Sequence, residues 1–234
     1  DLLLEDYLKA SMGGEEGKSA RFRYLFRRLS GLLQHLVARI AEEFAVSDFE
    51  PAAFELPISE KGGVQPLEFV TPAGARVTVE GVVDRADVME KNGRRYVRVV
   101  DYKSGAKTFD LGDVYYGLNL QMLVYLFSIC QNGGERLSGA VPAGVLYMPA
   151  KAGFLSASRD TGEKEAQKLQ RQTLRMSGLL IDDLTVLQGM EHDVEGVFIP
   201  AKLKSDGTLD PKSSVASLEE LGKIRRHVEK LICD

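Results

Sequence analysis

The dipeptide Asn92-Gly93 lies between two runs of alternating apolar residues and constrains the fold more than any other feature of the chain. A two-residue type I′ turn requires positive φ at both central positions, which Asn and Gly adopt readily. The pattern therefore predicts a β-hairpin over about residues 76–103, with Lys91 opposite Arg94. Because the turn fixes the register, each step back along the first strand matches one step forward along the second.

This register brings two carboxylates together. Asp84 falls opposite Asp101, and Lys103 lies two residues further along on the same face of the hairpin. The other positions on this face are apolar: Val82, Ala86, Val88, Val97 and Val99. Facing carboxylates on an apolar surface repel each other and are costly to bury. We therefore expect a cation to compensate them.

Two carboxylates at cross-strand distance suit Mg²⁺, or Mn²⁺ in its place, because these ions prefer oxygen ligands and retain coordinated water. Lys103 projects toward the same spot. There it would orient or deprotonate an attacking water, or offset the charge that develops on a phosphate.

The alternative interpretation is structural, since an isolated Asp-x-Lys on a strand usually belongs to a solvated polar face. The opposition of Asp84 and Asp101 within an apolar face favours the metal site instead. On the other face of the hairpin, Asp87 falls opposite Arg98. We expect these two residues to form an ion pair at the surface.

Hydrophobic periodicity predicts the remaining elements. Helices are expected over residues 19–46, 111–130, 162–176, 183–192 and 217–232, and further strands around 54–58, 143–148 and 196–203. Helices alternate with strands, which favours one α/β domain over residues 1–234. Within it we expect an N-terminal helical segment over about 1–46, a catalytic core over about 50–150 and a C-terminal α/β extension over about 151–234.

Gln121 and Tyr125 lie four residues apart and therefore on one face of the helix predicted over 111–130. Alone, such a pair is usually a half-buried amide and a core tyrosine. With the hairpin just upstream, the two side chains would reach Lys103 or a DNA phosphate.

The composition is that of a globular protein, with 234 residues, 44% of them hydrophobic and 27% charged. The sequence shows neither a long apolar span nor a secretory signal, so we expect a cytoplasmic protein without membrane association. Cys130 and Cys233 lack the spacing of a zinc site or a disulfide framework. Because the first residue is Asp1, we expect a fragment of a longer protein.

The formal charge of −4 argues against a nucleic-acid partner. The basic residues are clustered, however, within residues 21–28, 94–98 and 223–230. These clusters predict local positive surfaces that would face a partner or a DNA strand.

Three segments carry a family resemblance. Gly-Val-Val-Asp at 81–84, Asp-Tyr-Lys at 101–103 and Gln-Met-Leu-Val-Tyr at 121–125 resemble the G-x-x-D, D-Y-K and Q-x-x-x-Y motifs of RecB-like PD-(D/E)XK nucleases. Residues 115–121, 142–147, 198–200 and 212–213 resemble the C-terminal nuclease domain of AddB/RexB-type subunits of ATP-dependent helicase–nucleases. The resemblance implies a restriction-endonuclease-like fold, in which helices flank a mixed β-sheet.

By the same resemblance, Asp84 and Asp101 would be metal ligands together with the backbone carbonyl of Tyr102. Lys103 would be the catalytic lysine, with Gln121 and Tyr125 in support. The implied activity is Mg²⁺-dependent exonucleolytic hydrolysis of DNA at or behind an unwound end, during the processing of double-strand breaks for recombination. The implied partner is an AddA-type helicase–nuclease subunit.

The family also carries an iron–sulfur cluster held by four cysteines. This chain has only Cys130 and Cys233, so we expect the cluster ligands to lie beyond both ends of the fragment. His35 formally fits the G-x-x-x-H pattern of RecB-like nucleases, although a single histidine in a leucine-rich helix is more often a core-edge residue. Glu55, on the strand before the hairpin, is a candidate for a further acidic ligand.

A competing hypothesis is a scaffold or DNA-binding module that retains the nuclease fold without the reaction and docks the partner helicase. The presence of Asp84, Asp101 and Lys103 argues against it, because a decaying site would be expected to lose at least one of three costly charged groups. A third hypothesis, a metal hydrolase acting on a small molecule, has no sequence feature in its favour.

Overall fold

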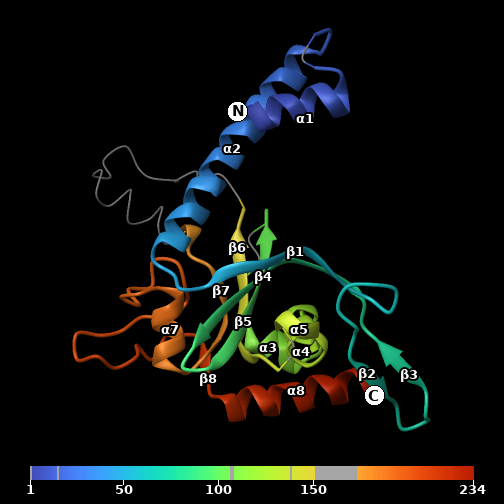
Figure 1. Ribbon diagram of the computed structural model, residues 1–234, viewed down its shortest axis with the longest axis vertical. Helices are drawn as coiled ribbons and strands as arrows, with labels where there is room; N and C mark the ends of the chain where they lie inside the picture. The colour runs from blue at the N-terminus through green and yellow to red at the C-terminus, as the bar shows by residue number, and fades with distance from the viewer. Residues whose placement is uncertain (1, 15, 106–107, 138, 151–172) are drawn as a thin grey trace.

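The computed structural model describes residues 2–14, 16–105, 108–137, 139–150 and 173–234. Its centre is a six-stranded sheet in the order β1-β4-β5-β6-β7-β8 (Figure 1). The strands are β1 (Glu50–Ile58), β4 (Gly81–Lys91), β5 (Arg94–Lys103), β6 (Val141–Pro149), β7 (Ser177–Ile181) and β8 (Val215–Ala216). A separate hairpin joins β2 (Glu68–Val70) to β3 (Arg76–Thr78).

The sheet is mixed, because β5 runs parallel to β6 and β7 parallel to β8, whereas the other neighbours are antiparallel. The helices are α1 (Leu2–Met12), α2 (Ala20–Ala45), α3 (Leu111–Tyr115), α4 (Gln121–Asn132), α5 (Gly134–Leu137), α7 (Leu184–Met190) and α8 (Leu218–Cys233). The α/β class with a mixed sheet and flanking helices is confirmed. None of the helices in the described residues combines the length and the apolar character that a membrane span requires.

The hairpin of β4 and β5 has the predicted register. Its pairs run from Lys91 opposite Arg94 to Arg85 opposite Val100. Both turn residues have positive φ, 54° at Asn92 and 72° at Gly93, as a type I′ turn requires. The ladder ends one position short of Asp84 and Asp101, so the open end of the hairpin carries the candidate site.

Helices cover the sheet on both sides. α4 packs against β5 and β6, and α8 packs against the outer side of α4 (Figure 1). The C-terminal end of α2 and α7 lie on the other side of the sheet. Ala86 and Val99 on one face and Val83 and Val100 on the other are at most 1% exposed. The centre of the hairpin is therefore buried on both faces.

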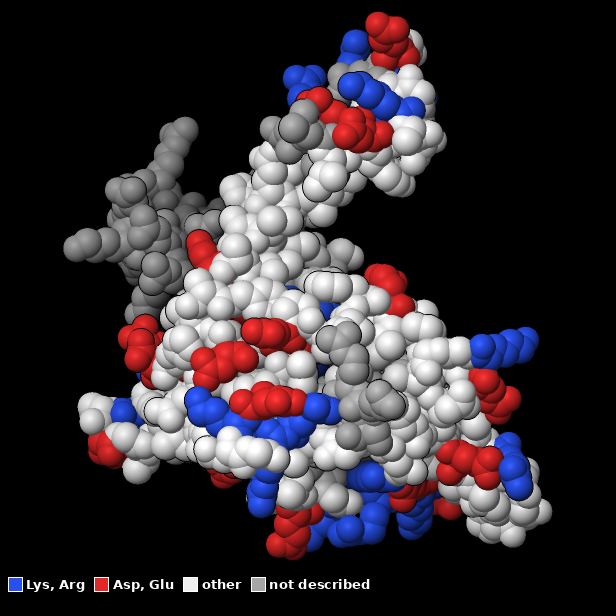
Figure 2. Space-filling model, viewed as in Figure 1, with Lys and Arg blue, Asp and Glu red and all other residues white. Residues whose placement is uncertain are grey.

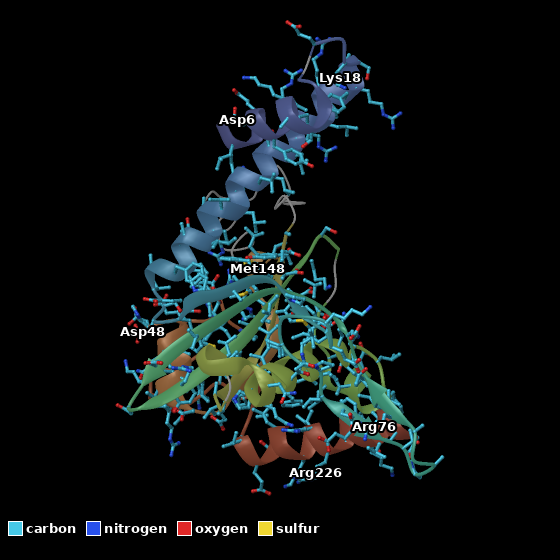
Figure 3. All side chains as sticks on the ribbon, turned by 45° about the vertical axis from the view of Figure 1, so that its right-hand side comes forward. Asp6, Lys18, Asp48, Arg76, Met148 and Arg226 are labelled. Atoms are coloured by element: carbon cyan, nitrogen blue, oxygen red, sulfur yellow. The ribbon has the colours of Figure 1, made fainter. Side chains whose placement is uncertain are left out.

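α1 and α2 form an arm that extends from the body of the molecule, with Asp6 and Lys18 near its far end (Figure 3). Ser19 caps α2 by accepting a hydrogen bond from the Phe22 N–H at 3.2 Å. On the face shown in Figure 2, charged side chains gather at the tip, whereas the shaft is largely uncharged. The predicted helix is confirmed, but Leu25 and Val37 on it remain 50% and 65% exposed.

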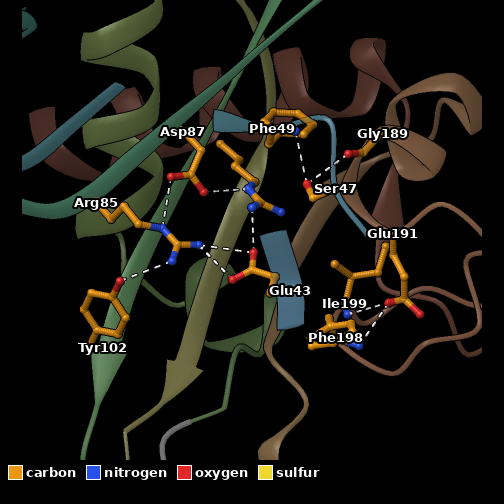
Figure 4. Close-up of polar contacts among 11 residues, drawn as sticks. Glu43, Ser47, Phe49, Arg85, Asp87, Tyr102, Gly189, Glu191, Phe198 and Ile199 are labelled. Atoms are coloured by element: carbon orange, nitrogen blue, oxygen red, sulfur yellow. Dashed lines mark hydrogen bonds and ion pairs between the residues drawn. The ribbon is translucent and has the colours of Figure 1, made fainter. Parts of the chain in front are cut away.

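Two predicted elements are wrong. The helix expected over 111–130 is divided into α3 and α4, because Gly117 and Asn119 have φ of 82° and 56°, which a helix does not allow. The strand expected over 196–203 is a loop. The N–H groups of Phe198 and Ile199 donate to the Glu191 carboxylate at 3.0 and 3.2 Å (Figure 4), and that of Val197 does so at 2.9 Å. These groups are therefore unavailable to a strand partner.

Other predicted elements are present with shifted bounds. The strands around 54–58 and 143–148 correspond to β1 and β6, and the helices over 183–192 and 217–232 to α7 and α8. The helix expected over 162–176 falls largely outside the described residues.

The prediction that Asp87 and Arg98 pair at the surface is also wrong. Glu43, Arg85, Asp87 and Arg98 are each 0% exposed and form what we call the buried ion quartet (Figure 4). Arg98 contacts Glu43 at 2.6 Å and Asp87 at 2.8 Å. Arg85 contacts Glu43 at 3.1 Å and Asp87 at 3.0 Å. The end of α2 supplies Glu43 and covers this face of the hairpin.

Within the quartet each carboxylate contacts both guanidinium groups, so two negative charges balance two positive charges. Burial by itself lowers the pKa of Arg85, but the adjacent Asp87 and Glu43 carboxylates outweigh this effect and raise the pKa. Arg85 therefore keeps its charge in the interior, and the ion pairs of the quartet join α2 to β4 and β5.

We predict that Glu43→Ala lowers the free energy of unfolding by about 3–5 kcal/mol, because it leaves buried arginine charge uncompensated. Urea denaturation followed by circular dichroism measures this change. The matched control is Glu42→Ala on the same helix, since the Glu42 side chain is 65% exposed and pairs with Arg39 at 3.4 Å. The Arg39 side chain is 12% exposed but keeps its hydrogen bond to the Val197 carbonyl at 2.6 Å, so removing the exposed Glu42 costs less than about 1 kcal/mol. Equal effects of the two substitutions would contradict the account.

Candidate active site

Asp84 lies near the start of β4 and reaches across to β5. Its Oδ2 accepts a hydrogen bond from the Tyr102 backbone N–H at 2.7 Å. Within the described residues, Oδ1 has no hydrogen-bond partner. The bond to Tyr102 thus holds the Asp84 carboxylate at the open end of the hairpin and leaves one oxygen available to a cation.

Asp101 and Lys103 lie on the same face of β5, near its end. Lys103 Nζ lies 2.5 Å from Asp101 Oδ2, and the side chains are 30% and 19% exposed. This ion pair engages Oδ2, whereas the other oxygen of the carboxylate, Oδ1, has no hydrogen-bond or ion-pair partner among the described residues. The same end of the hairpin therefore carries a second carboxylate oxygen, from Asp101, that is available to a cation.

These oxygens fit a hard divalent cation. Asp84 and Asp101 each offer a carboxylate oxygen, and the Tyr102 carbonyl belongs to the residue whose N–H binds Asp84. No cluster of three or more Asp, Glu, His or Cys side chains in the described residues is arranged to hold a metal. Backbone carbonyl and water would therefore complete the coordination, an arrangement that Mg²⁺ accepts because it retains several waters.

Tyr147 is a neighbour that the sequence patterns do not indicate. It lies on β6 opposite Asp101 in the parallel ladder, and the Lys103 Nζ is 5.6 Å from its ring centroid. Burial raises the pKa of the Tyr147 hydroxyl, and the negative charges of Asp101 and Asp113 raise it further. Asp113 belongs to α3, so this helix lies beside the candidate site. Tyr147 is identified as a neighbour of Asp101 only by the pairing of β5 with β6.

Gln121 and Tyr125 share a helix face, as predicted, and contact the start of β4. The Gln121 side chain donates to the Tyr125 hydroxyl at 2.7 Å, and this hydroxyl donates to the Glu80 carbonyl at 3.3 Å. A Cβ added at Gly81 would overlap the Tyr125 hydroxyl. The contacts described for Lys103 run instead to Asp101 and the Tyr147 ring. The glycine of the G-x-x-D segment therefore makes room for the tyrosine of Q-x-x-x-Y.

The Tyr102 side chain points to the other face of the hairpin. Its hydroxyl accepts a hydrogen bond from Arg85 Nη1 at 3.2 Å (Figure 4). Burial raises the pKa of this hydroxyl, although the nearby Arg85 charge opposes the increase. Tyr102 therefore connects the buried ion quartet, through its side chain, to Asp84, through its backbone.

The two remaining candidates are exposed. His35 lies on α2, and Glu55 lies on β1. The pairs Phe54–Arg85 and Leu56–Val83 on either side of Glu55 place it level with Asp84. Glu55 has a φ of 46°, a left-handed conformation that is strained for a residue with a side chain. In the described residues, neither side chain forms a hydrogen bond or ion pair with Asp84, Asp101 or Lys103.

A mixed six-stranded sheet with flanking helices is the fold that the resemblance to PD-(D/E)XK nucleases predicts, and Asp84, Asp101 and Lys103 lie at the open end of its central hairpin. The family described as PD-(D/E)XK nuclease superfamily matches residues 2–233, and the chain belongs to this superfamily. Both the fold class and the resemblance to this superfamily are thereby confirmed.

Several similar proteins are named as the B-type subunit of an ATP-dependent helicase/deoxyribonuclease. The one from Acetivibrio thermocellus is 33% identical over 233 residues, which are 98% of this chain and 20% of that protein. Those from Clostridium novyi and Symbiobacterium thermophilum are each 37% identical, over 94% and 92% of this chain and 20% and 18% of their own lengths. The chain thus spans about one fifth of the relatives it matches.

We predict that Gly81→Ala destabilises the start of β4, because the new methyl group and the Tyr125 hydroxyl would occupy the same space. Overpacking of this kind costs about 1–3 kcal/mol, measured by urea denaturation. Gly62→Ala is the control, since a Cβ there has open space and Gly62 does not have a left-handed φ. In Tyr125→Phe, which lacks the hydroxyl, Gly81→Ala should cost less. An unchanged cost in that background would contradict the clash.

Proposed function

We propose that this chain is a metal-dependent deoxyribonuclease domain that hydrolyses DNA as an exonuclease. The observation that carries the proposal is that Asp84 and Asp101 each keep one carboxylate oxygen, Oδ1, without a partner among the described residues, while Lys103 pairs with the other oxygen of Asp101. The names of the relatives, which combine helicase with deoxyribonuclease, support a DNA substrate and a helicase partner.

In this proposal Asp84, Asp101 and the Tyr102 carbonyl hold Mg²⁺, or Mn²⁺ in its place. A bound divalent ion of this kind supplies Lewis-acid polarisation of the scissile phosphate and neutralises its charge. Lys103 leaves its ion pair with Asp101 to stabilise the charge that develops on the phosphate, or to orient the attacking water. Proximity to Asp101 keeps the ammonium at the reacting centre before substrate arrives.

Gln121 and Tyr125 support the site in different ways. One N–H of the Gln121 amide is used by Tyr125, and the other is available to a DNA phosphate, since the Gln121 side chain is exposed. Tyr125 secures the first residues of β4 through Glu80 and the close approach to Gly81. We infer that this contact fixes the position of Asp84 relative to Asp101 and Lys103.

The wider setting follows from the resemblance and the relatives' names. We propose that the domain acts in the cytoplasm on a single strand at or behind an unwound DNA end, in complex with an AddA-type helicase–nuclease subunit. The reaction would prepare double-strand breaks for recombinational repair. An iron–sulfur cluster, if it accompanies this domain, would take its four cysteine ligands from outside residues 1–234.

We predict that Asp84→Asn and Asp101→Asn each abolish DNA cleavage while the chain stays folded. The second readout is metal binding. Mn²⁺ at 100 times its dissociation constant should stabilise the wild-type chain by about 2.7 kcal/mol, seen as a rise in Tm, and neither variant should respond. Glu68→Gln is the control, because within the described part of the chain Glu68 pairs only with the exposed Arg76, at 3.1 Å on β2–β3. Cleavage by Asp101→Asn would refute the assignment, and a wild-type Tm that ignores millimolar Mn²⁺ would favour an inactive scaffold.

We further predict that Tyr102→Phe weakens Mn²⁺ binding about tenfold, since groups that orient metal ligands typically affect affinity by this much. The substitution keeps the backbone N–H and carbonyl and removes only the hydroxyl that accepts from Arg85. Isothermal titration calorimetry measures the change. Tyr96→Phe is the control, because Tyr96 lies on the same face of β5 and is 6% exposed. Unchanged affinity in Tyr102→Phe would contradict a role for the Arg85 contact.

A further inference from the structure

Two tyrosines at the end of α3 are exposed to solvent. Tyr115 is 64% exposed and Tyr116 is 79% exposed. Their rings meet edge to face, with centroids 5.3 Å apart and an interplanar angle of 88°. Rings this exposed add little to the core, so their contribution to folding does not explain them.

The Tyr115 ring is held in place from one side. It stacks on the His227 ring of α8, with centroids 5.0 Å apart and planes inclined by 13°. The Nε2–H tautomer of His227 donates to the Tyr115 carbonyl oxygen, across 3.0 Å. Ring and backbone are thus both fixed to α8, while most of the Tyr115 side chain stays in contact with solvent. A surface of this kind is ordered before any ligand arrives.

The same part of α8 carries a stripe of basic residues. Lys223, Arg226 and Lys230 are separated by three and four positions and therefore share a helix face with His227. All three are exposed, and Figure 3 shows Arg226 on the outer side of α8. Arg226 and Lys230 form no ion pair among the described residues, whereas Lys223 pairs with the exposed Glu219 at 2.7 Å. We call these three residues the α8 basic stripe.

The tyrosines lie on a segment that borders the candidate active site at both ends. Two residues before Tyr115, Asp113 is near enough to Tyr147 to raise the pKa of its hydroxyl. After Tyr116, the chain reaches Gln121, which binds Tyr125 beside Gly81. A strand of nucleic acid on the tyrosines would therefore lie on a segment whose two ends lead to the site.

The acidic residues of this segment are already engaged. Asp110 caps α3 by accepting from the Gly112 N–H at 2.7 Å, and Asp113 accepts from the Asn119 amide at 2.8 Å. Figure 2 shows basic side chains along the edge where α8 lies, with acidic ones among them. The α8 basic stripe would thus bind the phosphates of a nucleic-acid strand only moderately. The two tyrosine rings would supply much of the affinity for the strand.

We propose that Tyr115 and Tyr116, together with the α8 basic stripe, form a stacking platform for single-stranded DNA that leads to the candidate active site. The proposal rests on the proposed nuclease function, because it assumes a DNA substrate. Unpaired bases have open faces that stack on aromatic side chains, whereas bases in a duplex are already stacked on each other. Lysine and arginine at the rim bind the phosphates without reading sequence.

The test is binding of a fluorescein-labelled oligothymidylate to the intact protein in EDTA, followed by fluorescence anisotropy. We expect Tyr116→Ala to weaken binding about tenfold and Tyr116→Phe, which keeps the ring, to bind like wild type. The control is Tyr24→Ala, which removes a tyrosine that is 58% exposed on α2. A labelled duplex of equal length should respond by less than about twofold, because its bases are already stacked.

The basic stripe has a separate signature. Loss of one phosphate contact in Arg226→Ala or Lys230→Ala should reduce the slope of log K against log salt by about 0.7 for a single strand. A third readout is photo-cross-linking to oligo(5-iododeoxyuridine), which should label Tyr115 or Tyr116 in the wild-type protein without any substitution. Mass spectrometry identifies the labelled peptide.

The outcomes separate this proposal from the proposed function. If Tyr116→Ala binds oligothymidylate like wild type, or if wild type does not bind it, the platform is wrong even where Asp101→Asn abolishes cleavage. If the tyrosine variants lose affinity but Asp101→Asn still cleaves, the platform stands and the active-site assignment fails. Tyrosine variants that bind DNA normally but fail to assemble with a partner subunit would identify a protein interface and overturn the platform.

Discussion

The buried ion quartet is the interaction on which the candidate site depends. Glu43, Arg85, Asp87 and Arg98 are fully buried, and each contacts two others. Loss of one member leaves charge without a partner in the interior, which is strongly destabilising. From Arg85 the network reaches the Tyr102 hydroxyl, and the Tyr102 N–H in turn binds Asp84. Charges on one face of the hairpin thus fix a carboxylate on the other.

Side chains alternate between the two faces of a β-strand, and this alternation couples the quartet directly to the candidate site. Asp84 and Arg85 are consecutive and point to opposite faces, so one residue joins the site and the next joins the quartet. At the start of β4, Tyr125 of α4 closes against Gly81 and leaves no space for a side chain there. The open end of the hairpin is therefore held from both sides, as a site must be if it is to keep two carboxylates and Lys103 in place.

The features that local sequence predicts well are those that local geometry determines. Asn92-Gly93 sets the hairpin register, and this register is enough to group Asp84, Asp101 and Lys103 as candidate site residues. The burial of Asp87 and Arg98 cannot be predicted in this way, because Glu43 reaches them from α2, far away in the sequence. The loop around Glu191 and the break between α3 and α4 escape prediction for a related reason, since apolar periodicity does not report hydrogen bonds to a distant carboxylate or left-handed residues.

The central claim is that Asp84 and Asp101 hold a divalent cation together with the Tyr102 carbonyl. Anomalous diffraction from crystals soaked in Mn²⁺ tests it most directly, because the manganese signal locates the ion independently of activity. The account predicts one or two peaks in contact with both carboxylates and the carbonyl oxygen, and their loss in Asp84→Asn/Asp101→Asn crystals. A wild-type map without a peak at this position, or a peak that persists in the double variant, would contradict it.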